Sequence, residues 1–303
     1  MTAVEHEEDV ASFARQVGRS DPVAVVGAKT HWHIGGVPDA GVRLVNAPVG
    51  IVAYEPAEMT IKVRAGTKVG AVNSELAAHG QMIPFDVVDD SATVGGVLAV
   101  GHSGTRRRRY GHIRDFVLQV TYVNAAGDVI AAGGPTVKNV SGYDLCRLMV
   151  GSLGTLGLVA EVTLRCVPVP AVSSWFAFDG NPRELNSSIF QASTILWNGE
   201  TTWVLLEGHA ADIESRSEQF ALRPVTEAPQ VPNAGRLSKR PSDVYDMAGN
   251  FMAEVGVGVV HVGAGHSELT SSIESTGARQ LHRAVKERMD PMNRLNPGRS
   301  PIL

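Results

Sequence analysis

The spacing of apolar residues predicts short helices and strands along the first half of the chain. Val10, Phe13, Ala14 and Val17 recur at helical intervals, so residues 7–21 are expected to contain a helix. Residues 69–80 have the pattern of a second helix that ends with a glycine, Gly80. Residues 22–36 predict a strand followed by a glycine-bearing turn. Further short strands are expected within 43–47, 50–69 and 81–86.

The pattern between residues 117 and 164 predicts a hairpin, a helix and a strand. Residues 117–134 are typical of two paired strands with a turn at 125–128. Residues 141–151 predict a helix that ends at Gly151, and a β-rich run from Val159 to Leu164 follows. Three glycines spaced three apart, Gly151, Gly154 and Gly157, precede that run, which raises the question of what needs them there.

The texture of the sequence changes after Pro170, where we place a domain boundary. Residues 171–255 lack the glycine clusters of the first half, and the proline-rich stretch 220–243 is expected to be a loop or partly disordered. A helix is expected after residue 278, followed by a turn at residues 296–299.

Composition excludes several classes of protein. The chain has 303 residues, of which 44% are hydrophobic and 19% charged, as in ordinary globular proteins. Its net charge of −4 gives no overall basic surface for nucleic acid. Two cysteines, Cys146 and Cys166, are too few for a disulfide framework or an Fe–S cluster, and a buried, reduced pair is favoured.

The sequence gives no sign of a membrane span or a secretory signal. No window approaches the roughly 20 apolar residues that a membrane helix requires, and the first ten residues are acidic and polar. We therefore expect a cytoplasmic protein. It would lie at the inner face of the membrane, as a peripheral protein, only by binding to partners.

Four glycine-bearing clusters stand out, at residues 26–36, 91–104, 106–115 and 151–159. Glycine lets backbone N–H groups converge on an anion and lets a flat ring approach the chain, although tight turns alone also use glycine. Two common nucleotide motifs do not fit. Ala28 separates Gly27 from Lys29, which excludes a P-loop. The glycines after residue 150 have the wrong spacing for a dinucleotide fingerprint, and their helix precedes them.

Longer motifs carry a resemblance to a known family. These are VGGVLAVGHSGTRRRRYGHIRDFVLQ at 94–119, KNVSGYDLCRLMVGS at 138–152 and NPGR at 296–299. Their order resembles the vanillyl-alcohol oxidase family, also called the PCMH-type fold, and in particular the FAD-binding subunits of glycolate oxidase. The resemblance covers roughly residues 20–170 and the last ten residues, and it is weak between them.

The resemblance implies an α+β fold. A PCMH-type FAD-binding domain of two α/β subdomains would occupy residues 1–170, followed by a small α+β cap domain at 171–285. A C-terminal tail, 286–303, would return to the first domain.

The resemblance also implies which residues bind FAD. The loop at 27–31 would hold the pyrophosphate, the segment 93–104 its other side, and the segment 152–159 would run beside the flavin ring, where side chains would collide with the cofactor. Lys29 either compensates phosphate charge or is an exposed loop lysine. The expected FAD-binding residues are Gly27, Ala28, Lys29, Thr30, His31, Pro84, Thr93, Val94, Gly95, Gly96, Gly101, Gly104, Arg109, Tyr110, Gly111, Ile113, Ser152, Gly154, Gly157, Val159 and Asn296.

The run Arg106–Arg109 has three interpretations: a nucleic-acid patch, a solvated loop, or phosphate support. Tyr110 is the one aromatic residue beside it, which argues against nucleic acid. The resemblance favours a loop at the mouth of the cofactor site or a partner-binding surface. Some relatives attach FAD through a histidine, but His31 and His33 lie further from the last glycine of their loop, so noncovalent FAD is expected.

Three residues are candidates for catalysis. Lys138 and Tyr143 lie in the best-matched segment and could face the flavin, although Tyr143 could equally pack in the core. His261 is a candidate general base in a degenerate form of a histidine-rich strand of related 2-hydroxy-acid dehydrogenases. His261 and His266 are too few ligands for a metal ion, so no metal site is expected.

The implied activity is oxidation of a 2-hydroxy acid such as glycolate or D-lactate, by hydride transfer to flavin. Electrons would then pass to other oxidase subunits that include an Fe–S protein. Two alternatives stay open. The chain could be an accessory subunit that binds FAD and relays electrons, or a scaffold that has lost its cofactor, which Ala28 in place of the usual glycine would suit.

Overall fold

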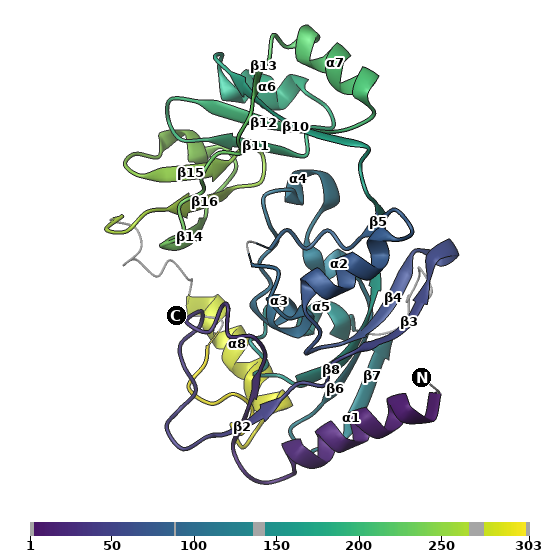
Figure 1. Ribbon diagram of the computed structural model, residues 1–303. Helices are drawn as coiled ribbons and strands as arrows, with labels where there is room; N and C mark the ends of the chain where they lie inside the picture. The colour runs from purple at the N-terminus through teal and green to yellow at the C-terminus, as the bar shows by residue number, and fades with distance from the viewer. Residues whose placement is uncertain (1–2, 88, 136–142, 267–275, 301–303) are drawn as a thin grey trace. The chain divides into compact units, whose positions relative to one another are not determined.

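The chain divides into two units in the computed structural model, which describes residues 3–87, 89–135, 143–266 and 276–300 (Figure 1). Unit 1 comprises Met1–His102, His112–Val169 and Glu274–Leu303. Unit 2 comprises Ser103–Gly111 and Pro170–Ile273. The division at residue 170 lies where the sequence texture changes. In two places the units differ from the expected domains: a short piece of the first half belongs to unit 2, and the returning tail begins near 274 instead of 286.

Unit 1 is built on a five-stranded antiparallel sheet with two small strand pairs beside it. The order in the large sheet is β3 (Ile51–Glu55), β4 (Thr60–Arg64), β8 (Leu158–Arg165), β6 (Val117–Val123) and β7 (Val129–Gly133). The parallel pair is β1 (Val23–Val26) with β2 (Arg43–Asn46), and the antiparallel pair is β5 (Gln81–Met82) with β9 (Val167–Pro168). The helices of unit 1 are α1 (Ala3–Val17), α2 (Val69–Ala77), α3 (Val94–Val100), α5 (Leu145–Met149) and α8 (Thr276–Met289), with 3₁₀ turns η1 (Pro56–Glu58) and η2 (Ile113–Phe116).

The predicted hairpin, the second helix and the strand after Gly157 are confirmed as β6–β7, α2 and β8. The predicted N-terminal helix is also confirmed, although it begins earlier than expected. Val10, Phe13 and Val17 form its buried face and pack against Leu158 of β8 in one core cluster. Helical spacing places these three side chains on one side of α1, so burying them fixes the helix against the sheet.

The C-terminal segment is part of this core. Leu295 pairs with Val23 in a parallel bridge beside β1 and is fully buried. Arg294 donates to the backbone carbonyls of Val17, Asp21 and Ala125. These bonds satisfy a buried guanidinium and tie the chain end to the start of unit 1.

Unit 2 is a seven-stranded antiparallel sheet with helices α6 (Pro182–Ser188), α7 (Ala210–Gln219), α4 (Arg107–Tyr110) and the 3₁₀ turn η3 (Asp243–Asp246). Its strand order is β13 (Arg223–Val225), β10 (Val172–Phe178), β12 (Thr202–Gly208), β11 (Thr194–Trp197), β15 (Phe251–Glu254), β16 (Val259–Val262) and β14 (Gly235–Ser238). The expected α+β class is therefore confirmed.

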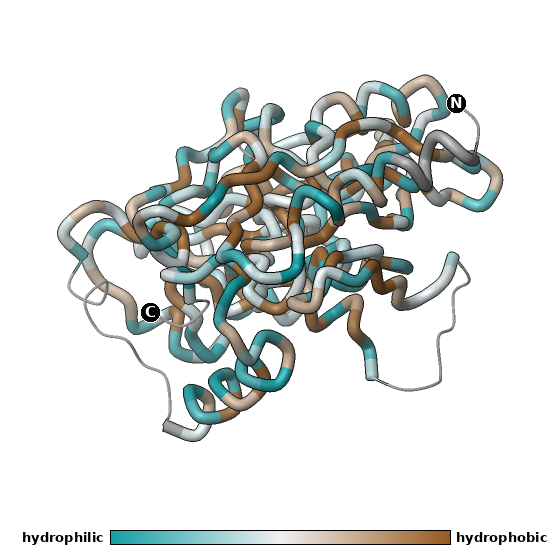
Figure 2. Tube along the Cα trace, turned by 90° about the horizontal axis from the view of Figure 1, so that it is seen from below, coloured by the Kyte–Doolittle hydropathy of each residue, from teal (hydrophilic) through white to brown (hydrophobic). Residues whose placement is uncertain are grey.

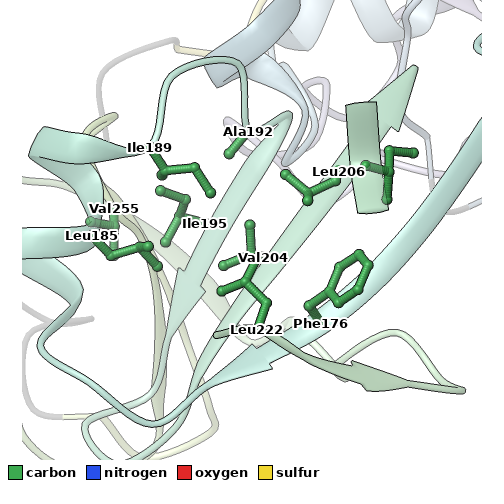
Figure 3. Packing of buried hydrophobic residues seen from close by; sticks show 10 residues of the cluster. Phe176, Leu185, Ile189, Ala192, Ile195, Val204, Leu206, Leu222 and Val255 are labelled. Carbon is green, nitrogen blue, oxygen red and sulfur yellow. The ribbon is translucent and has the colours of Figure 1, made fainter. Parts of the chain in front are cut away.

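A hydrophobic cluster joins the helices of unit 2 to its sheet. Leu185 of α6 and Ile189 meet Ile195, Val204 and other strand residues (Figure 3). Hydrophilic and hydrophobic residues are interleaved along the trace in Figure 2, as expected where helices and strands each bury one face.

The prediction of a loop or disorder across 220–243 is wrong in part. Two short strands, β13 and β14, lie in this stretch, at the two edges of the sheet. Pro224 lies within β13. Proline cannot donate to a ladder, but an edge strand tolerates it because one side of the strand needs no partner.

The arginine-rich segment belongs to unit 2. Arg106 forms an ion pair with Glu207 at 3.4 Å, Arg108 donates to Asn186 and Ile189, and Arg109 donates to the Glu207 carbonyl. The Tyr110 hydroxyl lies 3.4 Å from the Glu207 carboxylate. Burial lowers the pKa of Arg108 and raises that of Tyr110. These hydrogen bonds and the ion pair hold the segment against the rest of unit 2. The interpretation of the arginine run as a solvated loop is therefore wrong.

Both cysteines are buried and unpaired, as expected. Burial raises the pKa of the Cys166 thiol to about 12, so the thiolate that reacts with oxidants or metals is suppressed there.

Candidate functional site

Unit 1 contains a pocket at which three of the four glycine clusters meet. It lies beside β1, the start of α3 and the loop after α5, and the C-terminal segment closes it. None of its lining residues is acidic. The pocket is lined by Val25, Gly27, Ala28, Lys29, Thr30, His31, Trp32, Ala47, Ala65, Thr93, Gly95, Gly96, Ala99, Val100, Met149, Ser152, Leu153, Gly154, Gly157, Val159, Asn296 and Arg299.

The loop that follows β1 offers unused backbone donors. Among the residues that the structure describes, no acceptor is found for the N–H groups of Ala28, Lys29, Thr30 and His31. Lys29 has a left-handed backbone, with φ of +61°. Successive amides in such a turn form a concave donor surface that suits an anion. The loop after β1 therefore has the donor chemistry of a phosphate site.

The start of α3 differs, because the protein uses its amides itself. The N–H groups of Val94 and Gly95 donate to the carbonyls of Thr67 and Ala65, and that of Gly96 donates to the Thr93 hydroxyl. A Cβ on Gly95 would lie 2.7 Å from the Ala65 Cβ. This helix end therefore forms a wall of the pocket rather than a second set of free donors.

The loop after α5 answers the question raised by its glycines. Gly154 has φ of +69°, and a Cβ there would lie 2.4 Å from the side-chain nitrogen of Asn296. A Cβ on Gly157 would lie 2.5 Å from the Tyr122 ring. Packing inside unit 1 thus accounts for both glycines without a cofactor.

Asn296 joins the C-terminal segment to two walls of the pocket. It is 2% exposed, its Oδ1 accepts from the Val25 N–H at 3.0 Å, and its Nδ2 donates to the Leu153 carbonyl at 2.6 Å. Its backbone N–H donates to Val23. Because the amide side chain is fully used, Asn296 positions the pocket walls.

The charged residues of the pocket are cationic. Lys29 and Arg299 both lie over the ring of Trp32, at 5.4 and 4.3 Å from its centre. His31 shares a 3.1 Å hydrogen bond with the Thr30 hydroxyl. Its pKa is lowered, chiefly by burial and then by His33, against a smaller opposing effect of Asp89. The site therefore favours an anionic ligand.

Many of the expected FAD-binding residues line this one pocket: Gly27, Ala28, Lys29, Thr30, His31, Thr93, Gly95, Gly96, Ser152, Gly154, Gly157, Val159 and Asn296. The structure does not place the other expected residues in its lining. Pro84, Val94 and Ile113 are buried elsewhere, and Gly101 ends α3 with φ of +72° against Gly151. Gly104, Arg109, Tyr110 and Gly111 belong to unit 2, where the arginine segment is bonded.

Sequence reasoning missed Trp32 and Arg299 as well as the apolar lining residues Val25, Ala47, Ala65, Ala99, Val100, Met149 and Leu153. The NPGR motif was a signal for Arg299, since it stands three residues after Asn296. The apolar residues carry no such signal, because nothing in their type separates a pocket wall from a core.

The structure does not gather the candidate catalytic residues. Lys138 lies outside the described residues, and the Tyr143 side chain is 96% exposed, which excludes core packing for it. His261 lies on β16 of unit 2, with its Nε2 2.7 Å from the carboxylate of Glu254. Within the described residues, no group of three or more metal-ligating side chains occurs.

Comparison with known proteins agrees with this geometry. Residues 1–133 match the family model described as FAD binding domain. The chain is 34% identical over 207 residues to glycolate oxidase subunit GlcE of Escherichia coli K12, which is 65% of this chain and 59% of that protein. It is 32% identical over 166 residues to a D-lactate dehydrogenase of Anaerostipes hadrus, covering 54% of this chain and 35% of the relative. The chain thus spans less than two thirds of the length of these relatives.

A solved structure of alkyldihydroxyacetonephosphate synthase has the same fold. It matches with a TM-score of 0.69 and 15% identity, over 97% of this chain and 74% of that one. Fold and pocket together define a flavoprotein with an FAD-binding domain. Residues 1–133 match an FAD binding domain, and the chain has the PCMH-type fold.

The pocket fits FAD as its cofactor in two respects. The free amides after β1 and the two cations suit the negatively charged pyrophosphate. The apolar walls of Ala65, Met149 and Val159 suit a flat aromatic ring. In the described part of the chain, no helix is both long and apolar enough to cross a membrane.

Proposed function

We propose that this protein is an FAD-dependent oxidoreductase subunit that oxidises a 2-hydroxy acid, such as glycolate or D-lactate, to the 2-oxo acid. The observation that carries the proposal is the acid-free pocket beside the unpaired amides of residues 28–31. The names of the relatives, glycolate oxidase subunits and D-lactate dehydrogenases, support this substrate class.

Each part of the pocket has a role in the proposal. The N–H groups of residues 28–31 bind the pyrophosphate, and the residues from Ser152 to Val159 lie beside the ring. Asn296 holds these two walls at a fixed separation through its bonds to Val25 and Leu153. Bound noncovalently, FAD supplies the acceptor for the hydride that leaves the hydroxyl-bearing carbon. Fixed orientation of the reactants is the main contribution of the protein.

The proposed acceptor of the hydroxyl proton is His261. Its Nε2 faces the carboxylate of Glu254, which is buried. A neutral ring that donates from Nε2 to this carboxylate presents its unprotonated Nδ1 as the atom that accepts the proton. Glu254 therefore sets the tautomer and orientation of the base.

Electrons leave through a partner in this proposal. Two relatives are named as subunits of glycolate oxidase, GlcE and GlcD, which supports an assembly of several chains. The two cysteines of this chain are buried, so an Fe–S cluster would have to belong to another subunit. The proposal places the protein in the cytoplasm, peripheral to the inner face of the membrane only through such partners.

The test begins with the visible spectrum of the purified protein, which is expected to show bound flavin or to gain it on incubation with FAD. Anaerobic mixing with glycolate or D-lactate is then expected to bleach the flavin band. His261→Gln is expected to slow bleaching at least about 100-fold while leaving the flavin bound. A protein that cannot bind FAD would overturn the proposal.

A second candidate is an accessory subunit that binds FAD and relays electrons. The full exposure of Tyr143, a candidate catalytic residue, favours it. In that case no 2-hydroxy acid bleaches the flavin of the isolated chain, whereas a chemical reductant such as dithionite does. Rapid bleaching by substrate alone excludes this candidate.

A further inference from the structure

Two cations of the pocket converge on one aromatic ring. The guanidinium of Arg299 lies 4.3 Å from the centre of the Trp32 ring, and the ammonium of Lys29 lies 5.4 Å from it. Attraction to the negative face of the ring holds each cation in place. The ring cannot neutralise either charge, so both remain available to an anion.

Arg299 is half-buried, and one of its donors is buried without a partner in the described structure. Its Nη2 donates to the Trp32 carbonyl at 2.7 Å, whereas its buried Nε has no hydrogen-bond partner in the described structure. Burial lowers its pKa, which reflects the cost of placing a cation there. Arg294, five residues earlier, instead donates to three carbonyls. Since a buried, unpaired donor is costly, Arg299 is suited to a ligand.

The segment that carries Arg299 is interlocked with the loop that follows β1. The N–H of Asp39 donates to the Pro297 carbonyl at 2.9 Å, and the N–H of Ser300 donates to Gly35 at 2.8 Å. Gly298, with φ of +87°, fits between them, because a Cβ there would lie 2.4 Å from the Asp39 carboxylate. The backbone that carries Arg299 is therefore held against the loop that follows β1.

We propose that Arg299, assisted by Lys29, binds the pyrophosphate of FAD. This inference rests on the proposed FAD site and adds a charged contact from the end of the chain. A guanidinium can give two parallel hydrogen bonds to phosphate oxygens, which an ammonium cannot. With no acidic residue in the pocket lining, both positive charges act on the ligand. Trp32 positions the two cations.

The experiment compares three probes on the full chain stripped of flavin. FAD carries ring and pyrophosphate, riboflavin carries the ring alone, and ADP carries the pyrophosphate without the ring. Quenching of flavin fluorescence gives the Kd for the first two, and competition against FAD gives that of ADP. Arg299→Met, which keeps an aliphatic stem, is expected to weaken FAD and ADP at least about tenfold and to leave riboflavin unchanged.

Two further variants keep the test decisive. Arg299→Lys retains the charge and is expected to bind FAD more tightly than Arg299→Met but less tightly than the unmodified chain. This variant carries the test if Arg299→Met does not fold. Arg165→Met removes an exposed arginine that lies over the Phe116 ring at 4.9 Å, outside the pocket, and is expected to change no Kd.

Three outcomes overturn the inference. Equal FAD affinity of Arg299→Met and the unmodified chain would show that the guanidinium does not touch the cofactor. Equal weakening of riboflavin and FAD would show a structural role. Unchanged FAD affinity with a raised KM would assign Arg299 to the substrate carboxylate. If the unmodified chain binds no FAD, the proposed function itself fails.

Discussion

At the scale of single residues, glycine in the loop after α5 is required by the protein itself. The family resemblance attributes Gly154 and Gly157 to the approach of a flat ring. In the structure the space beside each α-carbon is already taken, by Asn296 for Gly154 and by Tyr122 for Gly157. Since Asn296 also holds Val25 and Leu153, an added methyl group at Gly154 disturbs the pocket through its neighbour.

Gly154→Ala is therefore expected to lower the free energy of unfolding by about 2 to 4 kcal/mol. Part of the cost is the left-handed backbone, and the rest is the contact at 2.4 Å with the Asn296 side chain. Gly80→Ala is the matched control, because Gly80 has a similar φ of +65° and open space where the methyl group would go. Urea unfolding of both variants without flavin measures the difference. Equal losses in the two variants would contradict the role assigned to Asn296.

At the scale of elements, the segment 103–111 illustrates a contact that no local pattern could predict. Arg109 donates to the carbonyl of Glu207, 98 positions away, and Arg108 donates to the Asn186 side chain, 78 positions away. An arginine run indicates positive charge and gives no information about the acceptors that satisfy it. The segment thus contributes a short helix, α4, to unit 2.

Arg108→Met is expected to destabilise unit 2 by about 1 to 3 kcal/mol, because Asn186 and the Ile189 carbonyl lose a charged donor. Arg107→Met is the control, since no hydrogen bond or ion pair of the Arg107 side chain is found among the described residues. Thermal unfolding, followed through the tryptophans of the sheet of unit 2, Trp175, Trp197 and Trp203, measures both variants. A larger loss for Arg107→Met than for Arg108→Met would contradict the assigned contacts.

At the scale of the whole molecule, the sequence predicted what depends on local order along the chain. Helical spacing located α1 and α2, and the glycine clusters located three walls of the pocket. The edge strand β13 escaped prediction because Pro224 signals a loop, whereas an edge position tolerates it, and β14 escaped because it lies in the same proline-rich stretch. Trp32 and Arg299 were not predicted as pocket residues. They lie far apart in the sequence, and only the fold brings the Arg299 guanidinium over the Trp32 ring.

The division into two units also determines how the cofactor should affect stability. All the residues that line the pocket belong to unit 1, and a ligand stabilises only the part of a protein that must be folded to bind it. At a free FAD concentration 100 times its Kd, we expect amides of β4 and β8 to gain about 2.7 kcal/mol of protection against hydrogen exchange by global opening. Amides of β11 and β12, in unit 2, are expected to gain much less.

Hydrogen exchange followed by mass spectrometry, with and without FAD, measures this difference between the units. Riboflavin at the same multiple of its own Kd is the control for occupancy, and it should give the same pattern because protection depends on saturation alone. Equal protection of β8 and β12 would mean that the two units unfold together. In that event the stability of unit 2, and with it the effect expected for Arg108→Met, would depend on the cofactor pocket of unit 1.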